Sequence, residues 1–121
     1  AFVVHGRDGM DEITVTTTSR VTELRDGVIT TSELDPARYF EGYHSLDDLM
    51  GGDPDVNAGI VRGLLNGEKG APRDVVAINA AAAIVAGNKA ESINDGLEMA
   101  LESIDSGAAA SVLDKFVAET N

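Results

Sequence analysis

The sequence has 121 residues, which suits one domain, and 43% of them are hydrophobic, enough to bury a core. It contains no cysteine, which excludes disulfides and thiolate metal sites, and its net charge of −12 argues against general nucleic-acid binding. No apolar run reaches the roughly 18 residues that a membrane helix needs. We expect no signal peptide, because no basic segment followed by an apolar run opens the chain.

The beginning of the chain predicts one strand and one loop. Residues 2–5 are apolar and β-branched, so we expect a buried strand that ends at Gly6. Residues 6–12 contain two glycines and three acids and predict a loop, whereas residues 13–19 fit either an extended or an irregular segment. Because the chain enters this apolar strand directly from Ala1, we expect the parent protein to continue upstream.

A β-hairpin is predicted next. Residues 21–25 and 28–32 flank Asp26-Gly27, a pair that suits the two positive φ angles of a type I′ turn. Residues 34–43 predict a loop, and Ser45 is expected to cap a short turn.

The second half of the chain predicts four helices. The first begins at the Asp53 cap followed by Pro54, and the second begins at Pro72. Ser92 and Asp95 predict a capping box for the third, and the fourth follows Gly107. The second helix is apolar nearly all round between residues 75 and 86, so we expect it to be buried.

This order of elements predicts an α/β fold. We expect part of a mixed sheet, with strands first and one β-hairpin, covered by about four C-terminal helices. One strand and one hairpin form a sheet that is too small to cover four helices. Residues 1–121 are therefore expected to be a single, partial α/β domain of a larger protein.

Asp11 and Glu12 are the residues most suited to chemistry. They are adjacent carboxylates after a strand and a glycine loop, and ligands bind at the carboxyl ends of strands in open α/β sheets. Mg²⁺ prefers oxygen ligands and often binds one or two carboxylates together with substrate phosphates. Acidic pairs on solvated loops are also common, so the spacing by itself leaves both interpretations open.

Three other polar residues favour structural roles. His5 ends the apolar strand, and we expect it to hydrogen-bond loop backbone rather than act as an acid or base. His44 lies in a polar loop and is expected to be exposed. Asn79 lies in the most apolar helix and is expected to tether that helix to a loop, because a buried amide needs partners. No phosphate-binding glycine loop and no Ser/His/Asp constellation is recognisable.

Residues 4–13 resemble the HGxDGxDE signature of the anthranilate phosphoribosyltransferases. The resemblance continues in the family's order through residues 21–24, 26–29, 51–54, 57–58, 65–70, 73–74, 79–81, 87 and 100–107. It covers essentially the whole chain and implies the C-terminal part of the catalytic α/β domain, of the nucleoside phosphorylase/phosphoribosyltransferase type.

The resemblance implies a glycosyltransferase that acts in tryptophan biosynthesis. Such enzymes carry out a Mg²⁺-dependent transfer of ribose 5-phosphate from phosphoribosyl pyrophosphate to anthranilate. The paired acids of the signature help to hold magnesium, and they correspond to Asp11 and Glu12. The resemblance assigns no catalytic residue here, and it implies a homodimeric, cytoplasmic parent with no membrane or nucleic-acid partner.

Some features of the family are missing from the chain. Its N-terminal helical domain and pyrophosphate loop are absent, and Thr17-Thr18 replace a usual Gly-Pro. We therefore expect the 121 residues alone to be inactive. The alternatives are a pyrimidine nucleoside phosphorylase-like domain, or a non-catalytic structural or interaction module; a nucleic-acid-binding relative conflicts with the acidic charge.

Overall fold

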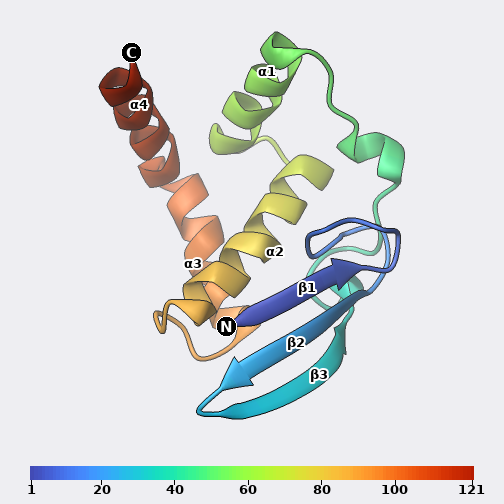
Figure 1. Cartoon of the computed structure of the whole chain (residues 1–121). Coiled ribbons are helices and arrows are strands. Elements are labelled where there is room, and N and C mark those ends of the chain that lie inside the picture. Colours follow the sequence, from blue (N-terminus) through green and yellow to red (C-terminus); the bar gives the residue numbers. More distant parts are fainter.

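The computed structural model describes residues 1–121, and Figure 1 shows a small sheet followed by helices. The strands are β1 (Phe2–Gly6), β2 (Ser19–Arg25) and β3 (Val28–Leu34). Two 3-10 helices follow, η1 (Pro36–Arg38) and η2 (Leu46–Leu49). The α-helices are α1 (Pro54–Leu65), α2 (Ala71–Ala86), α3 (Ile93–Asp105) and α4 (Ala108–Thr120). The α/β fold class is confirmed.

The three strands form an antiparallel sheet in the order β1-β2-β3. The predicted hairpin is confirmed, with φ angles of 52° at Asp26 and 79° at Gly27, as a type I′ turn requires. The parallel strands of a mixed sheet are not among these three. The chain thus contributes a purely antiparallel section of sheet.

The prediction that β1 is a buried strand is wrong. The side chains of Phe2 and Val4 are half-buried against the core, but Val3 is 72% exposed. The strand lies at one edge of the sheet, and the helices cover only one of its faces (Figure 1). Alternate residues of β1 therefore point away from the core.

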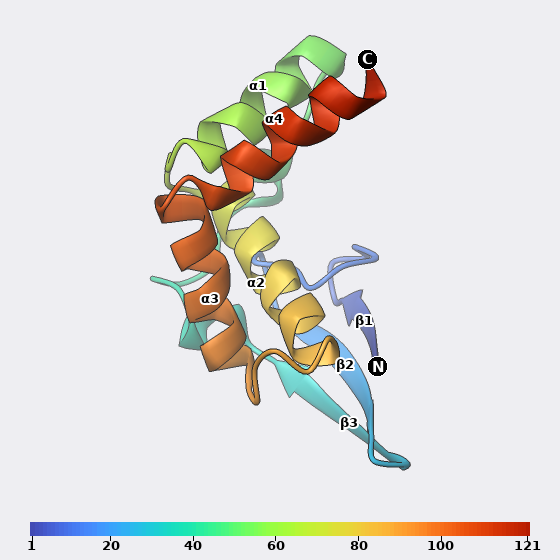
Figure 2. The same ribbon diagram turned by 90° about the vertical axis from the view of Figure 1, so that its left-hand side faces the viewer.

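Helices α2 and α3 pack against each other next to the sheet, whereas α1 and α4 extend away from it (Figures 1 and 2). Helix α2 is only partly as predicted. Ala77, Ile78 and Ala81 are fully buried, but Val76 on the other side is 43% exposed. Because α2 lies at the border of the core, only one side is covered.

The predicted caps are confirmed. The side chain of Asp53 accepts a hydrogen bond from the Val56 amide, and Ser92 and Asp95 form a capping box. Ser45 caps η2 in the same way, whereas η1 forms inside the segment that was predicted to be a loop. Local polar side chains therefore fix most helix starts.

An irregular segment occupies the centre of the core. Ile13, Thr14 and Val15 are fully buried, although they belong to neither a helix nor a strand. Ile13 and Val15 pack with hydrophobic residues of β2, β3, α2 and α3. The irregular alternative is thus confirmed for residues 13–18, whereas Ser19 already belongs to β2. Among the helices, none is long and apolar enough to cross a membrane.

Candidate functional site

The candidate site lies on the segment that connects β1 to β2, at the carboxyl end of β1. The first part of this segment is a tight turn: the Gly6 amide donates to the Met10 carbonyl at 2.8 Å, and the Gly9 amide donates to the Gly6 carbonyl at 2.9 Å. Gly9 has a φ of 99°, which favours glycine. The turn places the acidic pair immediately after it.

Asp11 and Glu12 are exposed, and neither side chain makes a hydrogen bond or an ion pair within the chain. The nearby Arg7 is bound instead to Glu33 of β3, so no cation of the loop neutralises the acidic pair. Both carboxylates are thus available to an external cation.

Asp8 differs from this pair because both of its carboxylate oxygens accept hydrogen bonds within the chain. Its Oδ2 accepts hydrogen bonds from the hydroxyls of Thr14 at 2.6 Å and Thr16 at 2.5 Å, and its Oδ1 accepts one from the Met10 amide at 3.1 Å. Burial opposes ionisation of Asp8, but these hydrogen bonds outweigh it and lower its pKa below the usual value. Sequence reasoning did not single out Asp8, because all three acids of the loop look alike without their partners.

Asn79 of α2 holds the other side of the acidic pair. Its Oδ1 accepts from the Ile13 amide at 2.9 Å, and its Nδ2 donates to the Ile13 carbonyl at 2.8 Å and to the Val75 carbonyl at 2.8 Å. The predicted helix-to-loop tether is confirmed. It joins residues that are 66 positions apart in the chain.

The two predictions about the histidines are wrong. His5 is exposed and its ring makes no hydrogen bond, because the outer face of β1 has nothing packed on it. The His44 ring is half-buried instead of exposed, and its Nε2 lies 2.8 Å from Asp74 Oδ2. The Asp74 side chain belongs to the first turn of α2, and no sequence signal connects it to a loop 30 residues earlier.

The exposed pair fits a magnesium ion that is shared with a ligand. No group of three or more His, Cys, Asp or Glu side chains converges on one point, so the chain offers no complete cage of protein ligands. Mg²⁺ keeps several waters and commonly binds one or two carboxylates plus substrate phosphates. Two adjacent, unpaired carboxylates match that requirement.

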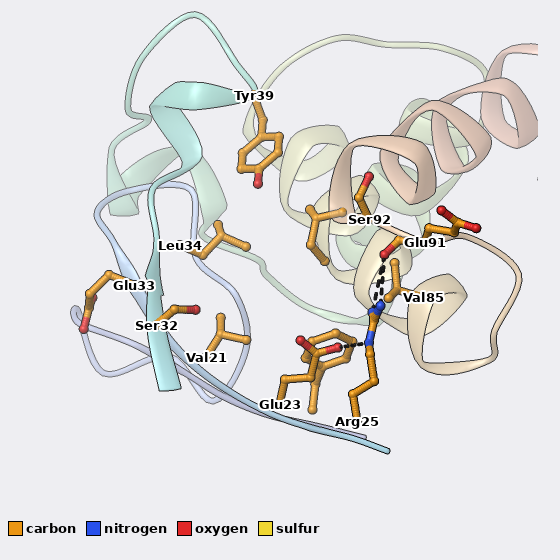
Figure 3. A pocket seen from close by; sticks show the side chains of 12 residues that line it. Val21, Glu23, Arg25, Ser32, Glu33, Leu34, Tyr39, Val85, Glu91 and Ser92 are labelled. Atoms are coloured by element: carbon orange, nitrogen blue, oxygen red, sulfur yellow. Dashed lines mark hydrogen bonds and ion pairs between the residues drawn. The ribbon is translucent and has the colours of Figure 1, made fainter. Parts of the chain in front are cut away.

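A separate cavity of about 340 Å³ lies between the sheet and the segment that joins α2 to α3 (Figure 3). Arg25 spans it, donating to Glu23 Oε1 at 2.7 Å and to the Glu91 carbonyl at 3.3 Å. The cavity lining runs along the sheet from Phe2 and Arg25 to Glu33 and Leu34. Neither Asp11 nor Glu12 is part of it.

Comparison with known proteins identifies relatives of this chain. Residues 1–110 match the model described as "Glycosyl transferase family, a/b domain". The anthranilate phosphoribosyltransferase of Acetivibrio thermocellus is 49% identical over 121 residues, which are 100% of this chain and 35% of that protein. The resemblance predicted from the sequence is thus confirmed.

Two solved structures share the fold. The anthranilate phosphoribosyltransferase of Thermus thermophilus is 37% identical, with a TM-score of 0.86 over 98% of this chain and 35% of that one. The Saccharomyces cerevisiae enzyme in complex with PRPP and Mg is 26% identical, with a TM-score of 0.82 over 95% of this chain and 33% of that one. The chain therefore spans about 35% of the length of these relatives.

Proposed function

The chain belongs to the a/b domain of the glycosyl transferase family, and on that basis we propose that it is part of an anthranilate phosphoribosyltransferase. The reaction transfers ribose 5-phosphate from phosphoribosyl pyrophosphate to the amine of anthranilate. Pyrophosphate leaves as a polyanion. The positive charge of a bound magnesium ion would stabilise this leaving group as its bond to the sugar carbon breaks.

One observation supports this proposal most: Asp11 and Glu12 are unpaired and exposed on a turn that is otherwise held by hydrogen bonds. These two carboxylates would hold magnesium, and the remaining ligands would be water and substrate phosphate. Their charge repels a phosphorylated substrate in the absence of the metal. The pair therefore makes binding of the diphosphate depend on a divalent cation.

The remaining substrate contacts are assigned to other parts of the enzyme. The chain has only nine lysines and arginines against 21 acids, and it has no glycine-rich phosphate loop. We expect the 121 residues alone to lack turnover, since one acidic pair does not bind both substrates. Placement in the C-terminal part of the catalytic domain, a homodimeric parent and a cytoplasmic location belong to the same proposal.

The experiment uses the whole protein that contains this chain. Steady-state rates with phosphoribosyl pyrophosphate, anthranilate and Mg²⁺ are compared for the parent, Asp11→Asn and Glu12→Gln. We expect kcat/KM to fall about 100-fold or more for each variant, the effect of losing an electrostatic contact to the transition state. The matched control is Glu119→Gln, which changes an exposed glutamate of α4 that has no partner.

Unchanged rates in both variants would remove Asp11 and Glu12 from the proposal. A parent that cleaves a pyrimidine nucleoside with phosphate, and not phosphoribosyl pyrophosphate, would favour the phosphorylase alternative. A parent with neither activity would favour the non-catalytic alternative.

A further inference from the structure

The loop that carries the acidic pair is fixed on both sides by side chains that the proposed chemistry does not use. Asp8 binds the Met10 amide just before the pair and the hydroxyls of Thr14 and Thr16 after it. Asn79 of α2 binds both backbone groups of Ile13, directly after the pair. Asp11 and Glu12 therefore lie between two anchored residues, Met10 and Ile13. The backbone of the pair is thus held by a carboxylate three residues before it and by an amide from a distant helix.

We infer that Asp8 and Asn79 are positioning residues that keep Asp11 and Glu12 in place for a divalent cation. This inference rests on the proposed metal-binding role of the pair. Asp8 itself is occupied by its two threonine hydroxyls and an amide, so it acts on the metal only through the backbone that it holds. Hydrogen-bonded partners of metal ligands generally orient those ligands and raise metal affinity.

The anchoring by Asp8 depends on the absence of a side chain at Gly6. A Cβ built on Gly6 would lie 2.5 Å from Asp8 Oδ1 and 3.1 Å from Thr14 Cγ2. The Thr14 amide is also satisfied, donating to Ser19 Oγ at 2.9 Å. Hydrogen bonds therefore join Asp8, near the start of the connection between β1 and β2, to the buried Thr14 and through it to Ser19, where β2 begins.

Preorganisation has a physical reason at this position. Two adjacent carboxylates repel each other, and ordering a free loop around a cation costs backbone entropy for every residue that becomes fixed. A loop that is ordered before the metal arrives avoids most of that cost. Loss of an anchor should therefore weaken metal binding even when the fold remains.

The test uses the whole protein that contains this chain, labelled with 15N, and Mn²⁺ as the probe. Mn²⁺ affinity is measured by calorimetry, its location by paramagnetic broadening of amide signals, and loop order by hydrogen exchange of residues 10–13. We expect the amide signals of Asp8→Ala to stay dispersed in the NMR spectrum, as they do in a folded protein. The dissociation constant of this variant for Mn²⁺ should rise about 10-fold or more, and amide exchange in the loop should accelerate. Asp8→Asn retains an acceptor and should recover part of both properties.

The matched control is Asp53→Ala, which removes an aspartate that accepts one backbone hydrogen bond from Val56 at the start of α1. It should leave Mn²⁺ affinity and loop exchange unchanged. If Asp8→Ala does not fold, Thr16→Val takes its place, because it removes only one hydroxyl from Asp8. Asn79→Asp tests the second anchor. Its side chain should still accept a hydrogen bond from the Ile13 amide but should no longer donate one to the Ile13 carbonyl.

The outcomes separate the inference from the proposed function. Unchanged affinity and exchange in Asp8→Ala would overturn the positioning role. If Asp11→Asn and Glu12→Gln leave Mn²⁺ binding intact, the metal site fails, and with it the claim that the anchors serve a metal. Faster exchange with lost affinity in Asp8→Ala, alongside lost binding in Asp11→Asn, supports both.

Discussion

Two regions of the molecule differ in how regular and how buried they are. One is the connection between β1 and β2, and the other is the pair of helices α1 and α4. The connection has almost no regular structure, but Ile13, Thr14 and Val15 are fully buried, and Ile13 and Thr14 are hydrogen-bonded to side chains. The two helices are regular, but Val56 is 50% and Phe116 is 64% exposed. Regular secondary structure and burial are therefore separate properties in this chain. The irregular segment should be sensitive to single changes, and the regular helices should tolerate them.

The largest effect is expected at Asn79. Asn79→Ala would leave the amide and carbonyl of the fully buried Ile13 without these partners. We expect a loss of about 3 kcal/mol in the free energy of unfolding, measured by urea denaturation. Asn94→Ala, at an exposed position of α3, is the control and should change stability little. Equal losses in the two variants would contradict the role of the tether.

Two glycine substitutions test packing in the same way. A Cβ at Gly96 of α3 would lie 2.7 Å from the Ala81 carbonyl of α2, so Gly96→Ala should destabilise the chain by about 1–3 kcal/mol. Gly59 of α1 has open space around the same position. Gly59→Ala should stabilise the chain by up to about 1 kcal/mol, because alanine favours helix. Thermal melting of both variants would show whether the signs differ as expected.

Asp8 should make the connection sensitive to acid. Its pKa is lower in the folded chain than in the unfolded one, so the folded state binds fewer protons. The stabilisation is present at neutral pH and is lost as the pH falls below about 3.9, the ordinary aspartate value, and through the folded pKa. The difference in urea midpoint between the parent and Asp8→Asn should therefore shrink over this range. A difference in urea midpoint that stays constant with pH would contradict this role of Asp8.

The smallest effect is expected on α4. Phe116→Gln replaces a side chain that is 64% exposed, so the free energy of unfolding should change by no more than about 0.5 kcal/mol. Denaturation of the isolated chain measures this. A loss of several kcal/mol would mean that α4 is packed more tightly than its exposure indicates.

The sequence predicts local features well and distant partners poorly. The Asp26-Gly27 turn and the Asp53 and Ser92 caps are confirmed because their partners lie within a few residues. The tethering role of Asn79 was predicted from its apolar surroundings, but its partner, Ile13, was not predicted. His44 was misjudged because its contact, Asp74, comes from another element.

The candidate site was predicted in the same uneven way. Asp11 and Glu12 stand out by their residue types and by the family signature, and their metal-binding role stays a prediction. Asp8 could not be distinguished from them, because what separates the three acids is which hydroxyls and amides lie nearby. The burial of β1 was overestimated, because an apolar sequence does not reveal whether one or both faces of a strand are covered.

The position of β1 at the edge of the sheet has a consequence for the isolated chain in solution. An edge strand presents unpaired backbone amides and carbonyls, and other chains add to such strands when no charge, proline or bulge prevents it. Residues 2–5 contain neither a proline nor a lysine, and Val3 is 72% exposed. Concentrated solutions of the chain are therefore prone to intermolecular β-pairing through this edge, and a charged residue at position 3 is the simplest way to suppress it.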